Sequence, residues 1–152
     1  MKETKKEKEK TKPIKILLIE DDFYTCQLYQ DIFSFEPNYQ LQTIKTIKNT
    51  EKVKERIEEI MPDIILLDLI LPLTPEKGRS YILDKELGFE ILNKLKSDEK
   101  TKDIPVIIVS NINNREDIER AKAIGAEEYL IKSEIFPQQV ISIIERVLQE
   151  KL

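Results

Sequence analysis

The stretch from Pro62 to Pro72, PDIILLDLILP, constrains the fold more than any other part of the chain. Its residues from Ile64 to Leu71 are all apolar except Asp68. A short continuous apolar run of this kind predicts a strand that is buried on both faces, as at the centre of a parallel sheet. Because a buried carboxylate without a partner is energetically costly, we expect Asp68 to lie where this strand leaves the core, close to a cation. The alternative is an aspartate that only begins a turn.

The rest of the chain alternates between strand and helix patterns. Besides the strand that ends near Asp68, we predict strands at Ile14 to Ile19, Tyr39 to Ile47, Ile104 to Val109 and Glu128 to Ile131. Helices are predicted between Asp22 and Pro37, over Asn49 to Ile60, directly after Gly88, over Asp117 to Ile124 and from Pro137 onward. Five strands that alternate with five helices predict an α/β fold, in which a parallel sheet is covered on both faces.

The length of 152 residues suits one domain with a proper core. Residues 1–12 carry six Lys and three Glu and have no apolar residue after Met1, so they predict a solvated tail rather than a docking arm. We therefore expect the folded domain to span residues 13–152. The net charge is −4, and it is −7 without the tail, so no global basic field favours direct binding of nucleic acid.

Two features of the composition exclude classes of function. Histidine is absent, which excludes a histidine metal site, a Ser-His-Asp triad and a phosphohistidine on this chain. The single cysteine, Cys26, excludes an intramolecular disulfide and fits a reducing compartment.

No apolar stretch reaches membrane-spanning length and no signal peptide is visible, so we expect a cytoplasmic protein without membrane contact.

Polar residues follow four of the predicted strands. Glu20 and Asp21 follow the first strand, Asp68 follows the third, Ser110 the fourth and Lys132 the fifth. In a parallel sheet these strand ends share one edge, which is where ligands bind. Crowded carboxylates repel one another unless they share a cation, and oxygen ligands without His or Cys suit Mg²⁺. A site with Mg²⁺, a lysine and a hydroxyl can receive a phosphoryl group on a carboxylate.

The chain resembles the receiver domains of two-component response regulators from about Ile14 to Leu148. The matching motifs are ILLIEDD, PDIILLDLILP, Gly88-Phe89-Glu90, IPVIIVS and GAEEYLIKS, in this order and spacing. The resemblance implies a flavodoxin-like doubly wound (βα)5 sandwich with a five-stranded parallel sheet of order 2-1-3-4-5.

The resemblance also implies a role for each site residue. Asp68 is expected to be the phosphoacceptor. Glu20, Asp21 and Asp68 are expected to hold Mg²⁺ together with the backbone carbonyl of Ile70, and Asp21 is the more direct ligand. Asp22 is more typical of the start of a helix than of a ligand.

Three further residues are expected to act on the phosphoryl group or to respond to it. Ser110 would donate a hydrogen bond to it, Lys132 would pair with it, and Ser110 and Tyr129 would act as the switch pair. Each has a simpler alternative: Ser110 as a loop cap, Lys132 as a surface cation and Tyr129 as ordinary packing.

The function implied is that of a stand-alone response regulator, which is a switch and not an enzyme. A sensor histidine kinase or a phosphotransfer protein would phosphorylate Asp68. The signal would pass to a downstream protein through the face made by the helix at 117–124, the strand at 128–131 and the last helix. The protein would be a monomer or a phosphorylation-dependent homodimer.

Two other functions remain open. The first is a docking module that keeps the fold and does not depend on phosphorylation. The second is a Mg²⁺-dependent aspartyl phosphatase, but such enzymes need an acid two residues after the nucleophile, where this chain has Ile70.

The chain departs from the family pattern at three places. The segment from Leu73 to Leu87, which contains Arg79 and Tyr81, is long and predicted to be irregular. Ser133 replaces the usual proline after the site lysine, so the peptide bond before it can be trans. Asn111 stands where a smaller residue is common and, with Ile70, predicts a longer-lived phosphoryl group.

Overall fold

The computed structural model describes residues 12–73 and 82–152. Residues 1–11 of the predicted tail and the central part of the long segment, with Arg79 and Tyr81, therefore lie outside the described residues. No helix in the described part is long and apolar enough to cross a membrane.

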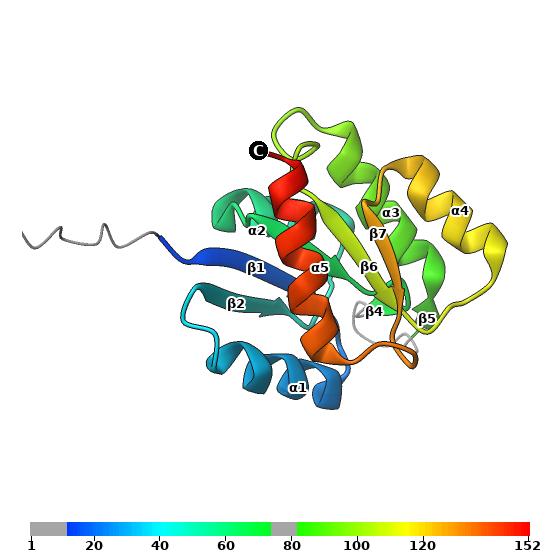
Figure 1. Cartoon of the computed structure of the whole chain (residues 1–152). Coiled ribbons are helices and arrows are strands. Elements are labelled where there is room, and N and C mark those ends of the chain that lie inside the picture. The colour runs from blue at the N-terminus through cyan, green and yellow to red at the C-terminus, as the bar shows by residue number, and fades with distance from the viewer. Residues whose placement is uncertain (1–11, 74–81) are drawn as a thin grey trace, which may run out of the picture.

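A five-stranded parallel sheet forms the centre of the protein (Figure 1). Its strands are β1 (Ile14–Ile19), β2 (Tyr39–Ile44), β3 (Ile64–Leu67), β6 (Val106–Ser110) and β7 (Glu128–Ile131). They lie in the order β2-β1-β3-β6-β7, and every neighbouring pair is parallel. Counted along the chain among these five strands, this is the predicted order 2-1-3-4-5.

Within the described ranges, five helices cover the two faces of the sheet. They are α1 (Phe23–Ser34), α2 (Thr50–Ile60), α3 (Lys85–Ser97), α4 (Arg115–Ile124) and α5 (Pro137–Glu150). Figure 1 shows α1 and α5 on the near side of the sheet and α2 and α3 on the far side. The flavodoxin-like α/β sandwich is thus confirmed.

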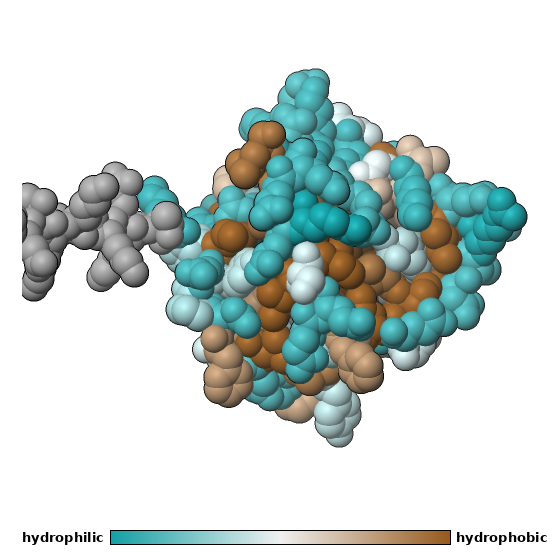
Figure 2. Space-filling model, viewed as in Figure 1, coloured by the Kyte–Doolittle hydropathy of each residue, from teal (hydrophilic) through white to brown (hydrophobic). Residues whose placement is uncertain are grey.

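The sheet separates two apolar cores. In β1, Leu17 and Ile19 pack on the side of α2 and α3, whereas Ile16 and Leu18 pack on the side of α1 and α5. All four residues of β3 are fully buried, which accounts for its unbroken apolar sequence. Figure 2 shows hydrophobic residues in the hollow alongside α5 and hydrophilic residues over the outer parts of this face.

The helix ends follow local sequence signals. Asp22 caps α1 by accepting a hydrogen bond from the Thr25 amide at 2.8 Å, as expected for a helix start. The C-cap of α4 is Gly125, whose φ of 131° favours glycine, and α5 begins at Pro137 as predicted.

The long segment contains structure that the sequence analysis did not predict. Strands β4 (Leu71–Leu73) and β5 (Ile82–Asp84) form a separate antiparallel pair, and α3 begins at Lys85, so Gly88 lies inside this helix and not before it. The prediction of an irregular Leu73 to Leu87 was therefore wrong at both ends of the segment. Three-residue strands leave too little periodic pattern to detect, and their pairing is not local.

Two other element boundaries differ from the predicted ones by a few residues. Strand β2 ends at Ile44 and not at Ile47, although Ile47 is buried in the core. Helix α4 begins at Arg115 and not at Asp117, because Asn114 is its N-cap and accepts a hydrogen bond from the Asp117 amide at 2.9 Å. Both differences concern element ends, where periodicity carries the least information.

Candidate functional site

The register of the sheet brings Glu20 and Asp68 side by side. Ile19 pairs with Leu67 at the ends of β1 and β3, and the next residues along the chain are Glu20 and Asp68. The Asp68 amide donates to the Ile19 carbonyl at 3.0 Å, which extends the backbone hydrogen bonding between β1 and β3 as far as Asp68. The two carboxylates therefore meet at the carboxyl edge of the sheet, where both residues are almost completely buried.

Asp21 completes a group of three acids. Carboxylate oxygens of Glu20, Asp21 and Asp68 all lie within 4.8 Å of one another. The donor set is made only of carboxylate oxygens, two of the residues are buried and Asp21 is partly exposed. Such a set fits a hard divalent cation that keeps some of its water, as Mg²⁺ does.

Lys132 is the counter-cation of this group. Its Nζ lies 2.6 Å from Oε2 of Glu20 and 3.1 Å from Oδ2 of Asp68. The Lys132 amide donates to the Ser110 carbonyl at 2.9 Å, so pairing of the chain beyond β7 with β6 directs the lysine toward the acids. Asp68 thus lies beside a cation at the end of its strand, as the sequence analysis expected.

Burial and charge set the protonation behaviour of the site. Burial, together with the nearby charge of Asp68, raises the pKa of Glu20 from 4.5 to about 7, although Lys132 acts in the opposite direction. Burial disfavours the Lys132 ammonium, but Asp68 and Glu20 outweigh it and raise the pKa of Lys132. The lysine is therefore charged at neutral pH, whereas Glu20 titrates close to neutrality.

The backbone around Asp68 is held from two sides. The Ile70 amide donates to Oδ1 of Asp68 at 3.2 Å, and the Gly88 amide donates to the Leu69 carbonyl at 3.2 Å. A Cβ atom on Gly88 would lie only 2.3 Å from the Leu69 Cα, so this contact requires glycine. Helix α3 thus packs directly on the segment that positions the Asp68 carboxylate.

Ser110 and Tyr129 both contact Ile112. Ser110 is fully buried at the end of β6, and its hydroxyl oxygen accepts from the Ile112 amide at 3.3 Å. The Tyr129 hydroxyl donates to the Ile112 carbonyl at 2.7 Å, and burial raises the pKa of this tyrosine to about 12. Among the described residues, the Ser110 hydroxyl forms no hydrogen bond with Asp68 or Lys132, so it is a neighbour of the acid site and not a direct partner.

Two residues near the site have structural roles. Both the amide and the hydroxyl of Thr25 donate to the Asp22 carboxylate, which caps α1 and is not part of the acid group. The peptide bond before Ser133 is trans, because the described chain has no cis peptide bond.

Asp117 is a buried acid that the sequence analysis treated only as a helix start. It accepts hydrogen bonds from Lys85 at 3.0 Å and from the Asn114 side chain at 2.8 Å, which lowers its pKa. The pair with Lys85 joins α4 to the start of α3. The spacing of Asn114 and Asp117, a capping residue and an acid three positions later, was the available signal.

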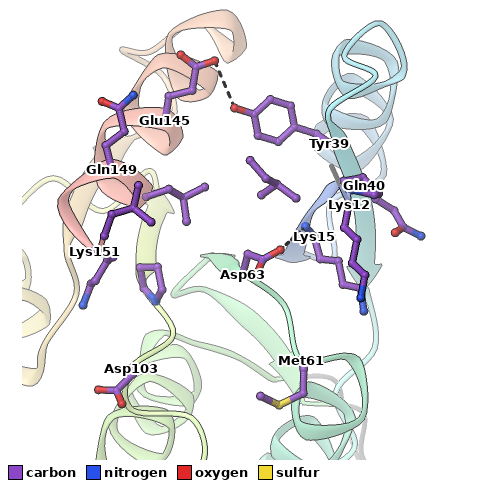
Figure 3. A pocket seen from close by; sticks show the side chains of 15 residues that line it. Lys12, Lys15, Tyr39, Gln40, Met61, Asp63, Asp103, Glu145, Gln149 and Lys151 are labelled. Atoms are coloured by element: carbon purple, nitrogen blue, oxygen red, sulfur yellow. Dashed lines mark hydrogen bonds between the residues drawn. The ribbon is translucent and has the colours of Figure 1, made fainter. Parts of the chain in front are cut away.

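A larger hollow, about 890 Å³ in volume, lies at the opposite edge of the sheet (Figure 3). Figure 3 shows the Tyr39 hydroxyl directed at Glu145 and the Lys15 backbone bonded to Asp63. The charged side chains that line this hollow are three lysines and three acids, which balance in charge. No cluster of potential metal ligands was found there among the described residues, so the carboxyl edge remains the candidate site.

Comparison with known proteins agrees with this geometry. The family model of the response regulator receiver domain matches residues 16–145. The chain belongs to the response regulator receiver family. Among curated receivers, the polar-differentiation response regulator DivK of Brucella anthropi is 28% identical over 131 residues, which are 86% of this chain and 94% of that protein.

Solved receiver structures have the same fold. A CheY-like receiver domain protein from Methanospirillum hungatei JF-1 has a TM-score of 0.71 and 22% identity, over 91% of this chain and 96% of that one. The phosphorylated cyanobacterial phytochrome response regulator RcpA has a TM-score of 0.65 and 27% identity, over 89% of this receiver and 91% of that chain.

Proposed function

We propose that this receiver accepts a phosphoryl group on Asp68 from the phosphohistidine of a sensor kinase or phosphotransfer protein. The observation that carries the proposal is the position of Asp68, 3.1 Å from the Lys132 ammonium and grouped with the oxygens of Glu20 and Asp21. Membership of the family supports it, as does a relative, RcpA, whose structure is that of a phosphorylated protein.

In the proposed step, a carboxylate oxygen of Asp68 attacks the phosphorus of the phosphohistidine. An O–P bond forms as the N–P bond breaks, and the electron pair of the broken bond returns to the imidazole nitrogen of the donor. The product on this chain is an acyl phosphate. Because the donor histidine belongs to the partner, the absence of histidine from this chain is compatible with the reaction.

Each neighbouring residue has a role in this proposal. Lys132 pairs with a phosphoryl oxygen, and the Ser110 hydroxyl donates to another. Glu20, Asp21, Asp68 and the Ile70 carbonyl are the groups that would hold Mg²⁺, which would neutralise charge on the phosphoryl oxygens when bound. The protein supplies position and electrostatics to its own phosphorylation, so it acts as a switch and not as an enzyme with an external substrate.

The signal is proposed to leave through the face formed by α4, β7 and α5. Ser110 and Tyr129 both bond to the backbone of Ile112, in the loop that leads into α4. A Ser110 hydroxyl that turns toward a phosphoryl group gives up its bond to the Ile112 amide, which frees this loop to move with Tyr129. A downstream protein in the cytoplasm would read the change, and a phosphorylation-dependent homodimer is one form it can take.

Intact-mass measurement after incubation with acetyl phosphate and Mg²⁺ tests the proposal. We expect one added phosphoryl group in the wild type, none in Asp68→Asn and none without Mg²⁺. Asp103→Asn serves as the matched control, because Asp103 is exposed and lies near the opposite edge of the sheet, and it should gain the group normally.

A beryllofluoride complex separates rapid hydrolysis from lack of reaction, because it imitates the phosphoryl group and does not hydrolyse. We expect Mg²⁺-dependent formation of this complex in the wild type and not in Asp68→Asn. If neither phosphoryl nor beryllofluoride adducts form while Mg²⁺ binds, the protein is instead a docking module that works without phosphorylation.

A further inference from the structure

A second feature at the carboxyl edge has no role in phosphoryl transfer. It is a hollow of about 440 Å³ beside the end of β2 and the start of α2. Four cations line it, with two threonines between them: Lys45, Lys48, Lys52, Arg56, Thr43 and Thr46. These six residues are called the basic hollow below.

The cations of the basic hollow are largely without partners. Arg56 lies 3.2 Å from Glu59, and both side chains are exposed. Lys45, Lys48 and Lys52 are exposed and form no salt bridge with any described residue. No aspartate or glutamate is among the described residues that line the hollow, although the whole chain carries a net charge of −4.

Two lysines elsewhere in the protein have a structural role that can be compared with the lysines of the hollow. Lys54 lies 2.7 Å from Asp98, and Lys96 lies 3.1 Å from Glu127 and also donates to two carbonyl groups. These lysines connect one helix or loop to another. The lysines of the basic hollow form no such connection, so packing of the fold does not account for their placement.

The basic hollow lies next to the acid site. The Ile44 carbonyl, in the wall of the hollow, accepts a hydrogen bond from the Glu20 amide at 3.1 Å. Glu20 and Asp68 have their own cation, Lys132, inside the acid site and form no ion pair with the lysines of the hollow. The hollow therefore offers its positive charge to a ligand from outside.

We propose that the basic hollow binds a short polyphosphate anion, either free or as part of a nucleoside polyphosphate. Its volume lies within the range of roughly 300–1,000 Å³ that is typical of small-molecule sites. Lysine ammonium groups act as point charges for phosphate, and threonine hydroxyls can donate to phosphate oxygens. Cations supplied by both the loop before α2 and the helix itself suit a ligand with several linked charges better than a single phosphate.

The charge of the remaining surface favours a short ligand over a polymer. The domain outside residues 1–12 has a net charge of −7, so a nucleic acid or an anionic membrane that extended beyond the hollow would meet repulsion. Ile44 and Val53 add an apolar part to the wall, where a nucleoside attached to the phosphates would find contact. The acid site beside the hollow also repels any longer anion.

Calorimetric titration of the full chain tests the proposal. Tripolyphosphate, ATP and inorganic phosphate are titrated separately at low salt, with EDTA present to exclude Mg²⁺ complexes at the acid site. We expect saturable binding of tripolyphosphate or ATP, weaker binding of inorganic phosphate, and loss of affinity as salt is added. Tighter binding of ATP than of tripolyphosphate would assign the ligand to the nucleoside form, and the reverse order to the free form.

The double variant Lys48→Gln with Lys52→Gln should lower the affinity at least about tenfold, because each lost charge-assisted hydrogen bond to phosphate is substantial. The control is Lys100→Gln with Lys122→Gln, two exposed lysines outside the hollow, which should change the affinity less than about twofold. Residues 1–12 are present in every variant, so binding to their lysines would survive both changes.

Asp68→Asn should bind tripolyphosphate at least as tightly as the wild type, which keeps this test independent of phosphorylation. The proposal is overturned if no phosphate ligand saturates, or if both double variants lose affinity equally. It is also overturned if the protein binds a single-stranded oligonucleotide or anionic vesicles but not tripolyphosphate or ATP.

Discussion

The ammonium nitrogen of Lys132 lies 2.6 Å from a carboxylate oxygen of Glu20, although 112 residues separate them in the chain. Glu20 follows β1, Asp68 follows the neighbouring strand β3, and Lys132 follows β7 at the edge of the sheet. The ion pair therefore joins the carboxyl ends of β1 and β7, with Asp68 beside it. Its strength depends on the protonation of Glu20, whose pKa burial raises to about 7.

The first prediction concerns the pH dependence of stability. Glu20 has a pKa of 4.5 when unperturbed and about 7 in the folded protein, so the folded state holds the proton more tightly. The stability gained from this proton is fully present below pH 4.5 and is lost as the pH rises to about 7, a loss on the order of 3 kcal/mol without metal. Carboxyl groups with a lowered pKa, such as Asp117, titrate below this window.

Urea unfolding of the metal-free protein between pH 5 and pH 8 measures this effect. The variant Glu20→Gln resembles the protonated residue, so its free energy of unfolding should fall less steeply with pH than that of the wild type. The difference in slope should correspond to up to one proton. Parallel profiles for the two proteins would show that Glu20 does not titrate in this range.

The second prediction concerns charge repulsion within the acid group. Asp68→Asn removes one of three carboxylates and leaves the contact between Lys132 and Glu20 in place. We expect it to stabilise the metal-free protein at pH 8 by about 1 kcal/mol and to lower the pKa of Glu20. Thermal melts with and without Mg²⁺ should also show a smaller Mg²⁺ shift in the variant; equal shifts would contradict the proposed metal site.

The third prediction concerns Lys132. Lys132→Met leaves two buried carboxylates without their cation, and we expect a loss of about 3 kcal/mol at pH 8. Because the cost comes from unpaired charge, adding Glu20→Gln to Lys132→Met should recover a large part of it. Urea unfolding of the two single variants and the double variant measures the coupling, and strictly additive losses would show that the contact has no energetic role.

The fourth prediction concerns the contact of Gly88 with the backbone beside Asp68. In Gly88→Ala the new Cβ would overlap Leu69, so the segment that carries Asp68 must shift. We expect a loss of stability of about 1–3 kcal/mol together with weaker Mg²⁺ binding and slower phosphorylation by acetyl phosphate.

Gly125→Ala is the matched control for Gly88→Ala. Gly125 has a positive φ at the end of α4, away from the acid group, so this variant should also be less stable but should bind Mg²⁺ normally. Normal Mg²⁺ binding in both variants would mean that the packing of α3 does not position Asp68.

Much of the fold and of the site could be predicted from the sequence because both follow from local patterns and from parallel topology. The apolar run before Asp68 predicts a central strand, and the alternation of strands with helices brings the following polar residues to one edge. Asp68, Glu20 and Lys132 are indeed in contact there. The phosphoacceptor, metal and switch roles of these residues and of their neighbours stay predictions.

What the sequence did not predict depends on contacts between distant segments. The pairing of β4 with β5 joins residues on either side of positions 74–81, and each strand is too short to show a period. The contact of Gly88 with Leu69 and the burial of Asp117 against Lys85 depend on how α3 packs, which no local pattern specifies. The cations of the basic hollow are likewise brought together by the turn from β2 into α2.

Chemical trapping of the phosphorylated residue tests the central claim most directly. The protein is incubated with acetyl phosphate and Mg²⁺ and reduced with borohydride, which converts an aspartyl phosphate to homoserine, and its peptides are sequenced by mass spectrometry. We predict homoserine at position 68 and at no other position. Homoserine at position 21 instead, or a phosphoryl group that borohydride does not reduce, would contradict the assignment of Asp68 as the phosphoacceptor.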